Sequence, residues 1–69
     1  MNRIPVQSSN VAEVGYEPET MILEVLFHDG DIYQYFDVHY LLYEELLRTD
    51  SVDRFLNTQI KNVHRCVRL

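Results

Sequence analysis

The stretch MILEVLFHDGDIYQYFDV, residues 21–38, decides the predicted fold because two strand patterns flank a strong turn signal. Every second residue of the first half is apolar, so that face of the strand should point into the core. The residues of this face are Met21, Leu23, Val25 and Phe27. Asp29-Gly30 is typical of a tight turn between two hydrophobic runs, and IYQYF follows as the partner strand. The stretch therefore predicts an antiparallel hairpin.

Two weaker strands are expected before this hairpin. RIPVQ, residues 3–7, should form an edge or irregular strand, because Pro5 cannot donate a hydrogen bond to a neighbouring strand. VAEVGY, residues 11–16, alternates weakly, and strict alternation places Val11 and Val14 on opposite faces. The segments SSN and EPET between the strands have turn chemistry.

The hydrophobic period becomes helical after the hairpin. We expect Asp37 to cap a helix over 38–48, with Glu44 and Arg48 as an i,i+4 ion pair. The expected buried stripe of this helix is Val38, Leu41, Leu42, Leu46 and Leu47. The segment TDS should cap a second helix over 52–60, whose apolar stripe is Val52, Phe55, Leu56 and Ile60. In the tail KNVHRCVRL, Val63, Val67 and Leu69 either add a last short strand or pack against the core.

These elements predict one α+β domain over residues 1–69. It should be an antiparallel β-meander of three or four strands followed by two α-helices packed on one sheet face. The single cysteine, Cys66, excludes a disulfide within the chain and is typical of a reducing compartment. No segment approaches the roughly 20 apolar residues of a membrane span, and no secretory signal is visible. We therefore expect a cytoplasmic protein without contact to a membrane.

Charge divides the chain into two parts. The net charge is −5, which disfavours non-specific binding to nucleic acid. Residues 1–50 carry two arginines against ten acidic groups, for a charge of −8, whereas residues 51–69 carry four cations against Asp53, for a charge of +3. This asymmetry indicates either an interaction face or ordinary helix electrostatics, and both interpretations remain open.

No group of side chains forms a catalytic or metal signature. Asp29 and Asp31 beside His28 superficially suggest a metal site, but Asp and Gly already have a role in the turn. His64 and Cys66 could form half of a soft-metal or nucleophilic site, yet the sequence supplies no further ligand or orienting group. The prediction is a protein that is not an enzyme and holds no metal or cofactor.

Five tyrosines leave one real ambiguity. Tyr33 and Tyr35 share one strand face, where they could stack on unpaired bases or form the wall of the core. The neighbouring aspartates would repel phosphates, which favours the core interpretation.

The chain resembles the KTSC domain in five segments, which occur in the order expected for that family. They are SSNVAEVGY, LEVLFHDGDIYQYFDV, YEELL, DSVDRFLN and QIK. This domain is found at the C-terminus of some lysyl-tRNA synthetases and as a small stand-alone bacterial or phage protein. The resemblance implies a strand-rich unit closed by helices, no enzymatic activity, and a suggested role in RNA binding. Tyr33 and Tyr35 occupy the family's Tyr-x-Tyr positions. His39 stands where a proline is common, Asp53 stands where glycine is usual, and the tail is less aromatic.

Two functional hypotheses follow. The first is a non-catalytic interaction or accessory module with an unknown protein partner or with a second copy of itself. The alternative is an RNA-binding module that uses the tyrosines and the basic C-terminal region. The candidate binding residues are Tyr33, Tyr35, Arg54, Lys61, Arg65 and Arg68.

Overall fold

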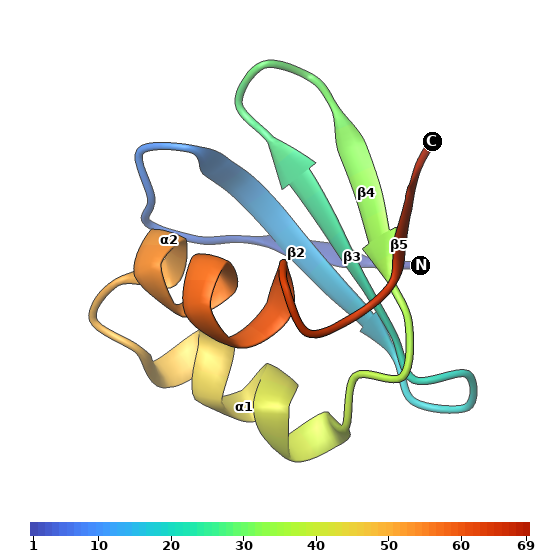
Figure 1. The fold of residues 1–69 in the computed structure, drawn as a ribbon. Helices are drawn as coiled ribbons and strands as arrows, with labels where there is room; N and C mark the ends of the chain where they lie inside the picture. The colour runs from blue at the N-terminus through green and yellow to red at the C-terminus, as the bar shows by residue number, and fades with distance from the viewer.

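The computed structural model describes residues 1–69 and shows a five-stranded antiparallel sheet beside two helical segments (Figure 1). The strands are β1 (Arg3–Pro5), β2 (Val11–Glu17), β3 (Ile22–Phe27), β4 (Ile32–Tyr35) and β5 (Cys66–Arg68), in the order β1-β2-β3-β4-β5. Between β4 and β5 come the helices α1 (Tyr40–Arg48) and α2 (Val52–Phe55), and the π-helical turn η1 (Leu56–Ile60) continues α2. The predicted meander followed by helices is confirmed, and the tail adds a fifth strand.

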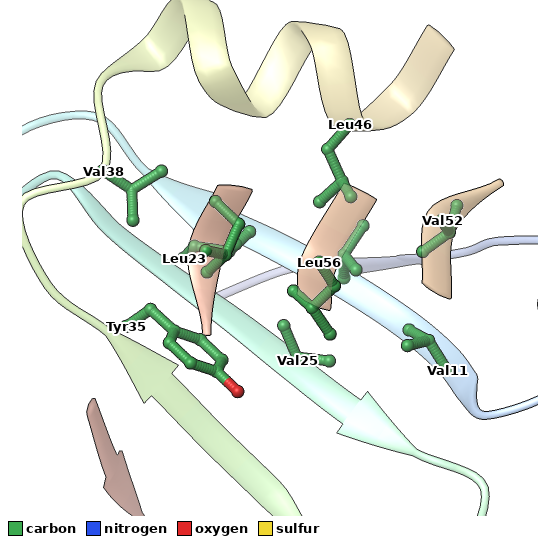
Figure 2. Packing of buried hydrophobic residues seen from close by; sticks show 10 residues of the cluster. Val11, Leu23, Val25, Tyr35, Val38, Leu46, Val52 and Leu56 are labelled. Atoms are coloured by element: carbon green, nitrogen blue, oxygen red, sulfur yellow. The ribbon is translucent and has the colours of Figure 1, made fainter. Parts of the chain in front are cut away.

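The core lies between the helices and one face of the sheet. Figure 2 shows Leu46 of α1 and Leu56 of η1 above the side chains of β3, with Tyr35 beside Leu23. Fully burying a side chain of this size contributes roughly 1.5–3 kcal/mol relative to leaving it in water. The ten core residues are Val11, Val14, Leu23, Val25, Tyr35, Val38, Leu46, Val52, Leu56 and Ile60. No helix has the length and apolar content needed to cross a bilayer.

The β3–β4 hairpin forms as predicted. The Gly30 amide donates to the Phe27 carbonyl at 2.9 Å, and the Phe27 amide donates to the Asp31 carbonyl at 2.9 Å. Gly30 has φ +96°, a left-handed conformation that residues with a side chain rarely adopt. The Asp29 carboxylate accepts from the Asp31 amide at 2.9 Å, so it serves the turn.

Helix α1 begins later than predicted, and Asp37 is not its cap. Asp37 has φ +57° and lies in a left-handed turn, because the next residue, Val38, enters the core and donates its amide to the Met21 carbonyl at 2.9 Å. The cap is His39, whose Nδ1 accepts from the Leu41 amide at 3.1 Å. The second cap is confirmed, since Ser51 Oγ accepts from the Arg54 amide at 3.3 Å.

Part of the predicted stripe on α1 is wrong. Leu41 is 60% exposed and Leu47 is 42% exposed, whereas Leu42, Tyr43 and Leu46 face the core. These three residues span about 100° of the helix circumference, and Leu41 lies about 145° from their centre. The Glu44–Arg48 ion pair is confirmed at 3.8 Å.

A bulge in β2 overturns the alternation expected there. The pairing of β2 with β3 shifts between Val11 and Glu13, so one extra residue lies on β2. Because of this insertion, Val11 and Val14 both point into the core, although strict alternation separates them. In β3, Leu23 and Val25 are buried as predicted and Phe27 packs against them, while Met21 lies in the preceding turn with φ +57°.

Candidate functional site

A groove opens where the helices leave the core-side face of β4 and β5 uncovered. In Figure 1 the two strands lie to the right of the helices, and the chain after η1 crosses toward β5. The groove has a volume of about 440 Å³. Its lining residues are Phe27, Asp29, Asp31, Tyr33, Tyr35, Lys61, Asn62 and Cys66. The groove therefore joins the β3–β4 hairpin, the last two strands and the end of η1.

Aromatic rings form the floor of this groove. The Tyr33 and Phe27 rings meet edge to face with centroids 5.6 Å apart, and the Tyr33 and Tyr35 rings stack at 6.3 Å. In the antiparallel register Tyr33 lies opposite Val25, and Tyr35 lies opposite Leu23, so both rings share the core face of the sheet. The floor is thus continuous with the hydrophobic core.

The two tyrosines differ in depth. Tyr35 is only 2% exposed, whereas Tyr33 is half-buried and packs at the margin of the core. Burial raises the pKa of the Tyr35 phenol to about 12, with smaller contributions from Cys66 and Tyr33. Tyr35 therefore lies in the wall of the core, whereas Tyr33 lies at its margin with part of its ring facing the groove.

Charges of both signs surround the rings. The Lys61 ammonium lies 5.3 Å from the centroid of the Phe27 ring, a favourable cation–π distance. At the hairpin end, Arg68 Nη2 lies 3.2 Å from Asp31 Oδ1, so this arginine neutralises one of the two aspartates. The groove therefore has an aromatic floor, a basic wall and a mixed-charge end.

The predicted basic residues do not gather in one place. Lys61 lines the groove, and Arg68 lies opposite Tyr33 in the β4–β5 register. Arg65 lies on the other face of the sheet, where its guanidinium is 5.8 Å from the Phe36 ring centroid. Arg54 is exposed on α2 and does not line the groove. The structure thus joins Tyr33, Tyr35 and Lys61, and it separates two of the four cations from them.

His64 and Cys66 do not combine into a reactive pair. The His64 Nδ1 atom donates to the Phe36 carbonyl at 3.0 Å, which fixes the ring against the backbone. Cys66 is exposed beside Tyr35 in the groove. No three His, Cys, Asp or Glu side chains lie close enough together to hold a metal ion. The structure therefore brings no further ligand to His64 and Cys66, which the sequence suggested as half of a metal or nucleophilic site.

A second tyrosine cluster was missed by the sequence analysis. Tyr16 stacks on Tyr43 with centroids 4.9 Å apart, Tyr40 packs 5.8 Å from Tyr16, and the Tyr16 hydroxyl donates to the Val38 carbonyl at 2.6 Å. Burial, and to a lesser extent the charge of Tyr40, raises the pKa of Tyr16 and Tyr43. The helical spacing of Tyr40 and Tyr43 is the signal that could have shown this cluster. Its contacts hold the start of α1 on β2.

Asp53 and His39 both accept hydrogen bonds that fix the start of a helix, His39 from a nearby amide and Asp53 from the distant residues Ser8 and Ser9. His39 caps α1, and the Asp53 carboxylate accepts from the Ser8 hydroxyl at 2.7 Å and the Ser9 hydroxyl at 3.0 Å. These bonds, led by the one from Ser8, lower the pKa of Asp53. The loop between β1 and β2 is thereby tied to the first turn of α2.

Comparisons with known proteins agree with this architecture. The model of the KTSC domain family matches residues 7–64. An uncharacterized protein of Stutzerimonas stutzeri is 41% identical over 64 residues, which cover 93% of this chain and 90% of that protein. A protein of Tsukamurella paurometabola is 37% identical over 65 residues, covering 94% and 97% of the two chains. The crystal structure of a KTSC domain protein from Yersinia pestis superposes with a TM-score of 0.93 at 32% identity, covering 99% of this chain and 96% of that one. The chain therefore belongs to the KTSC domain family.

Proposed function

We propose that the chain is a non-catalytic protein-interaction module whose groove receives an extended segment of a partner protein. The observation that carries this proposal is the position of the aromatic groove beside the outer edge of β5. The amide of Phe36 donates to the Arg65 carbonyl, and the amide of Leu69 donates to the Ile32 carbonyl. In an antiparallel ladder this pattern turns the amides and carbonyls of Cys66 and Arg68 outward.

An outward-facing row of amides and carbonyls is the element to which extended peptides add. A peptide strand along β5 would direct alternate side chains toward the groove, where Tyr33 offers its half-buried ring and Lys61 its charge. Residues 61–69 contain three cations and no acidic side chain. Of these cations Lys61 lines the groove, and it favours a partner segment that carries an acidic side chain next to an apolar or aromatic one.

The matched test uses proline at position 68. Arg68→Pro removes the outward amide without touching the amides that pair with β4, whereas Arg68→Ala removes only the charge. We expect peptides selected from a displayed library to be acidic, to shift the amide resonances of Cys66 and Arg68, and to bind Arg68→Pro at least about tenfold more weakly than Arg68→Ala. Equal binding by both variants, or resonance shifts confined to α1, would contradict the proposal.

RNA binding is the second candidate, and the presence of Lys61 in the groove that Tyr33 also lines favours it. A strand of RNA on this groove would meet Asp29 and Asp31 at one end, and it would find Arg65 on the opposite sheet face. These positions support the protein-interaction module over the RNA-binding one. Fluorescence anisotropy with tRNA and single-stranded RNA at low salt separates the two, because RNA affinity should fall as salt rises. Salt-dependent binding that Lys61→Glu abolishes would favour RNA.

A further inference from the structure

The sheet face away from the helices has no protein layer over it, yet it is rich in apolar side chains. An antiparallel sheet with one solvated face usually alternates apolar and polar residues. Here β3, β4 and β5 carry apolar residues on the uncovered face as well, and Val67 is 44% exposed. The apolar residues of this face are Ile22, Leu26, Ile32, Phe36, Val67 and Leu69.

The strand registers arrange this uncovered face in three rows across β2 to β5. The rows are Glu17–Ile22–Phe36–Arg65, Gly15–Glu24–Gln34–Val67 and Glu13–Leu26–Ile32–Leu69. Both outer rows begin with a glutamate on β2 and continue through two apolar side chains on β3 and β4. The first row ends with the exposed cation Arg65. Charge of opposite sign therefore marks the two ends of that row.

The polar centre of the face is already satisfied within the chain. Arg3 Nη1 donates to Glu24 Oε2 at 2.6 Å, and Gln34 Nε2 donates to Glu24 Oε1 at 2.9 Å. Arg3 Nε also donates to Glu13 Oε1 at 3.3 Å, and Glu24 is only 6% exposed. Because both carboxylate oxygens of Glu24 have donors, a second layer could cover them without leaving a buried charge unpaired.

We propose that this face packs against the same face of a second copy of the chain, about a two-fold axis parallel to the strands. This axis places each row opposite the same row of the second copy, and the two rows run in opposite directions. Arg65 then faces Glu17 of the second copy, and Phe36 faces Ile22. The other two-fold axis in the plane between the sheets, perpendicular to the strands, would instead place Glu13 over Glu17. Charge complementarity selects the first arrangement.

The size of the face fits a reversible dimer. The extents of the molecule are 28, 24 and 23 Å, so a face that spans the two larger ones is limited to about 670 Å² per copy. The total of at most about 1,300 Å² is close to the lower bound for specific interfaces, so we expect a dissociation constant on the order of ten micromolar. The helix-side groove of the proposed function lies on the opposite side of the sheet, so this pairing is independent of that proposal.

Sedimentation velocity on the whole chain tests the pairing, with charge reversal at the two ends of one row. The contact between Arg65 of one copy and Glu17 of the other occurs twice in a two-fold dimer. Each of Arg65→Glu and Glu17→Arg should therefore weaken the dimer at least about tenfold, because it turns both contacts into pairs of like charge. An equimolar mixture of the two variants should form a dimer again, since both opposite-charge contacts return in the mixed pair. Arg54→Glu, on α2, is the matched control and should leave the dimer unchanged.

Several outcomes would overturn the inference. A wild-type chain that stays monomeric up to about 500 µM excludes a dimer of the expected strength. A dimer that tolerates both charge reversals, or two monomeric variants that do not associate when mixed, would refute the two-fold arrangement. Circular dichroism checks that the variants fold. If either does not, Val67→Lys at the exposed end of the central row replaces it and should likewise weaken the dimer at least about tenfold.

Discussion

Replacing Tyr35 with phenylalanine removes one hydroxyl from a ring that lies almost wholly inside the core. That hydroxyl has no hydrogen-bond partner within the chain, and no buried side-chain oxygen lacks a partner, so the oxygen must reach the water of the groove. Figure 2 shows the oxygen at the border of the apolar cluster. We therefore expect Tyr35→Phe to change the free energy of unfolding at pH 7 by less than about 1 kcal/mol.

The effect should appear at alkaline pH. Burial raises the pKa of Tyr35 to about 12, whereas an unfolded tyrosine titrates near about 10. The folded state thus favours the neutral phenol, whose contribution to stability is fully present below about pH 10 and is lost as the pH rises toward about 12. Two pKa units correspond to about 2.7 kcal/mol, and water contact at the hydroxyl reduces the expected loss to about 1–2 kcal/mol.

Urea unfolding of both proteins, followed by circular dichroism from about pH 7 to about pH 12, measures this loss. Because the other tyrosines titrate in both proteins, the difference between the two curves isolates position 35. Tyr35→Phe should become the more stable protein by about 1–2 kcal/mol at the alkaline end. A difference that stays constant with pH would refute the buried phenol. Tyr35→Ala is the packing control and should cost about 3 kcal/mol at pH 7.

Three further substitutions test other contacts. Asp53 has a lowered pKa, so the stability that its carboxylate contributes should be present above about pH 4 and be lost as the pH falls. In Asp53→Asn, the free energy of unfolding measured with urea should therefore fall less steeply toward acid pH than in the wild type. An equally steep fall in both proteins would contradict the serine contacts. Arg3→Met should lower the urea midpoint because Glu24 then keeps only one donor, and the double variant with Glu24→Leu should recover part of that loss. Additive losses in the two single variants and the double variant would argue against the network. Gly15→Ala would place a Cβ 2.8 Å from the backbone oxygen of Asn2. We therefore expect about 1–3 kcal/mol of destabilisation and faster amide hydrogen exchange in β1. Unaltered exchange would show that β1 accommodates the methyl group.

The elements that depend on local patterns could be predicted from the sequence. The alternation of β3 and the Asp29-Gly30 turn act within a few residues, so the hairpin and its core face follow directly. The α1 cap could not be assigned in the same way. Asp37 has the better capping chemistry, but burial of Val38 carries the chain away from the helix axis for two residues more. The bulge in β2 is likewise set by its pairing with β3, and no local pattern marks it.

The burial depth of the two groove tyrosines could not be predicted from the sequence. Alternation indicates that Tyr33 and Tyr35 share a face, and the structure agrees, but alternation carries no information on depth. Depth depends on where the covering helices end, and that boundary separates the buried Tyr35 from the half-buried Tyr33.

The placement of the basic residues in the C-terminal tail likewise depends on strand pairing. Once β5 pairs with β4, the alternation of the strand places Arg68 on the groove side and Arg65 on the uncovered face, so one run of charge divides between two surfaces. The positive charge that suggests one interaction face in the sequence is therefore distributed over two surfaces in the fold. These surfaces are separable by mutation, because Arg68 and Arg65 can be changed one at a time. A partner that depends on Arg68 but not on Arg65 would identify the groove, and an assembly that depends on Arg65 but not on Arg68 would identify the opposite sheet face.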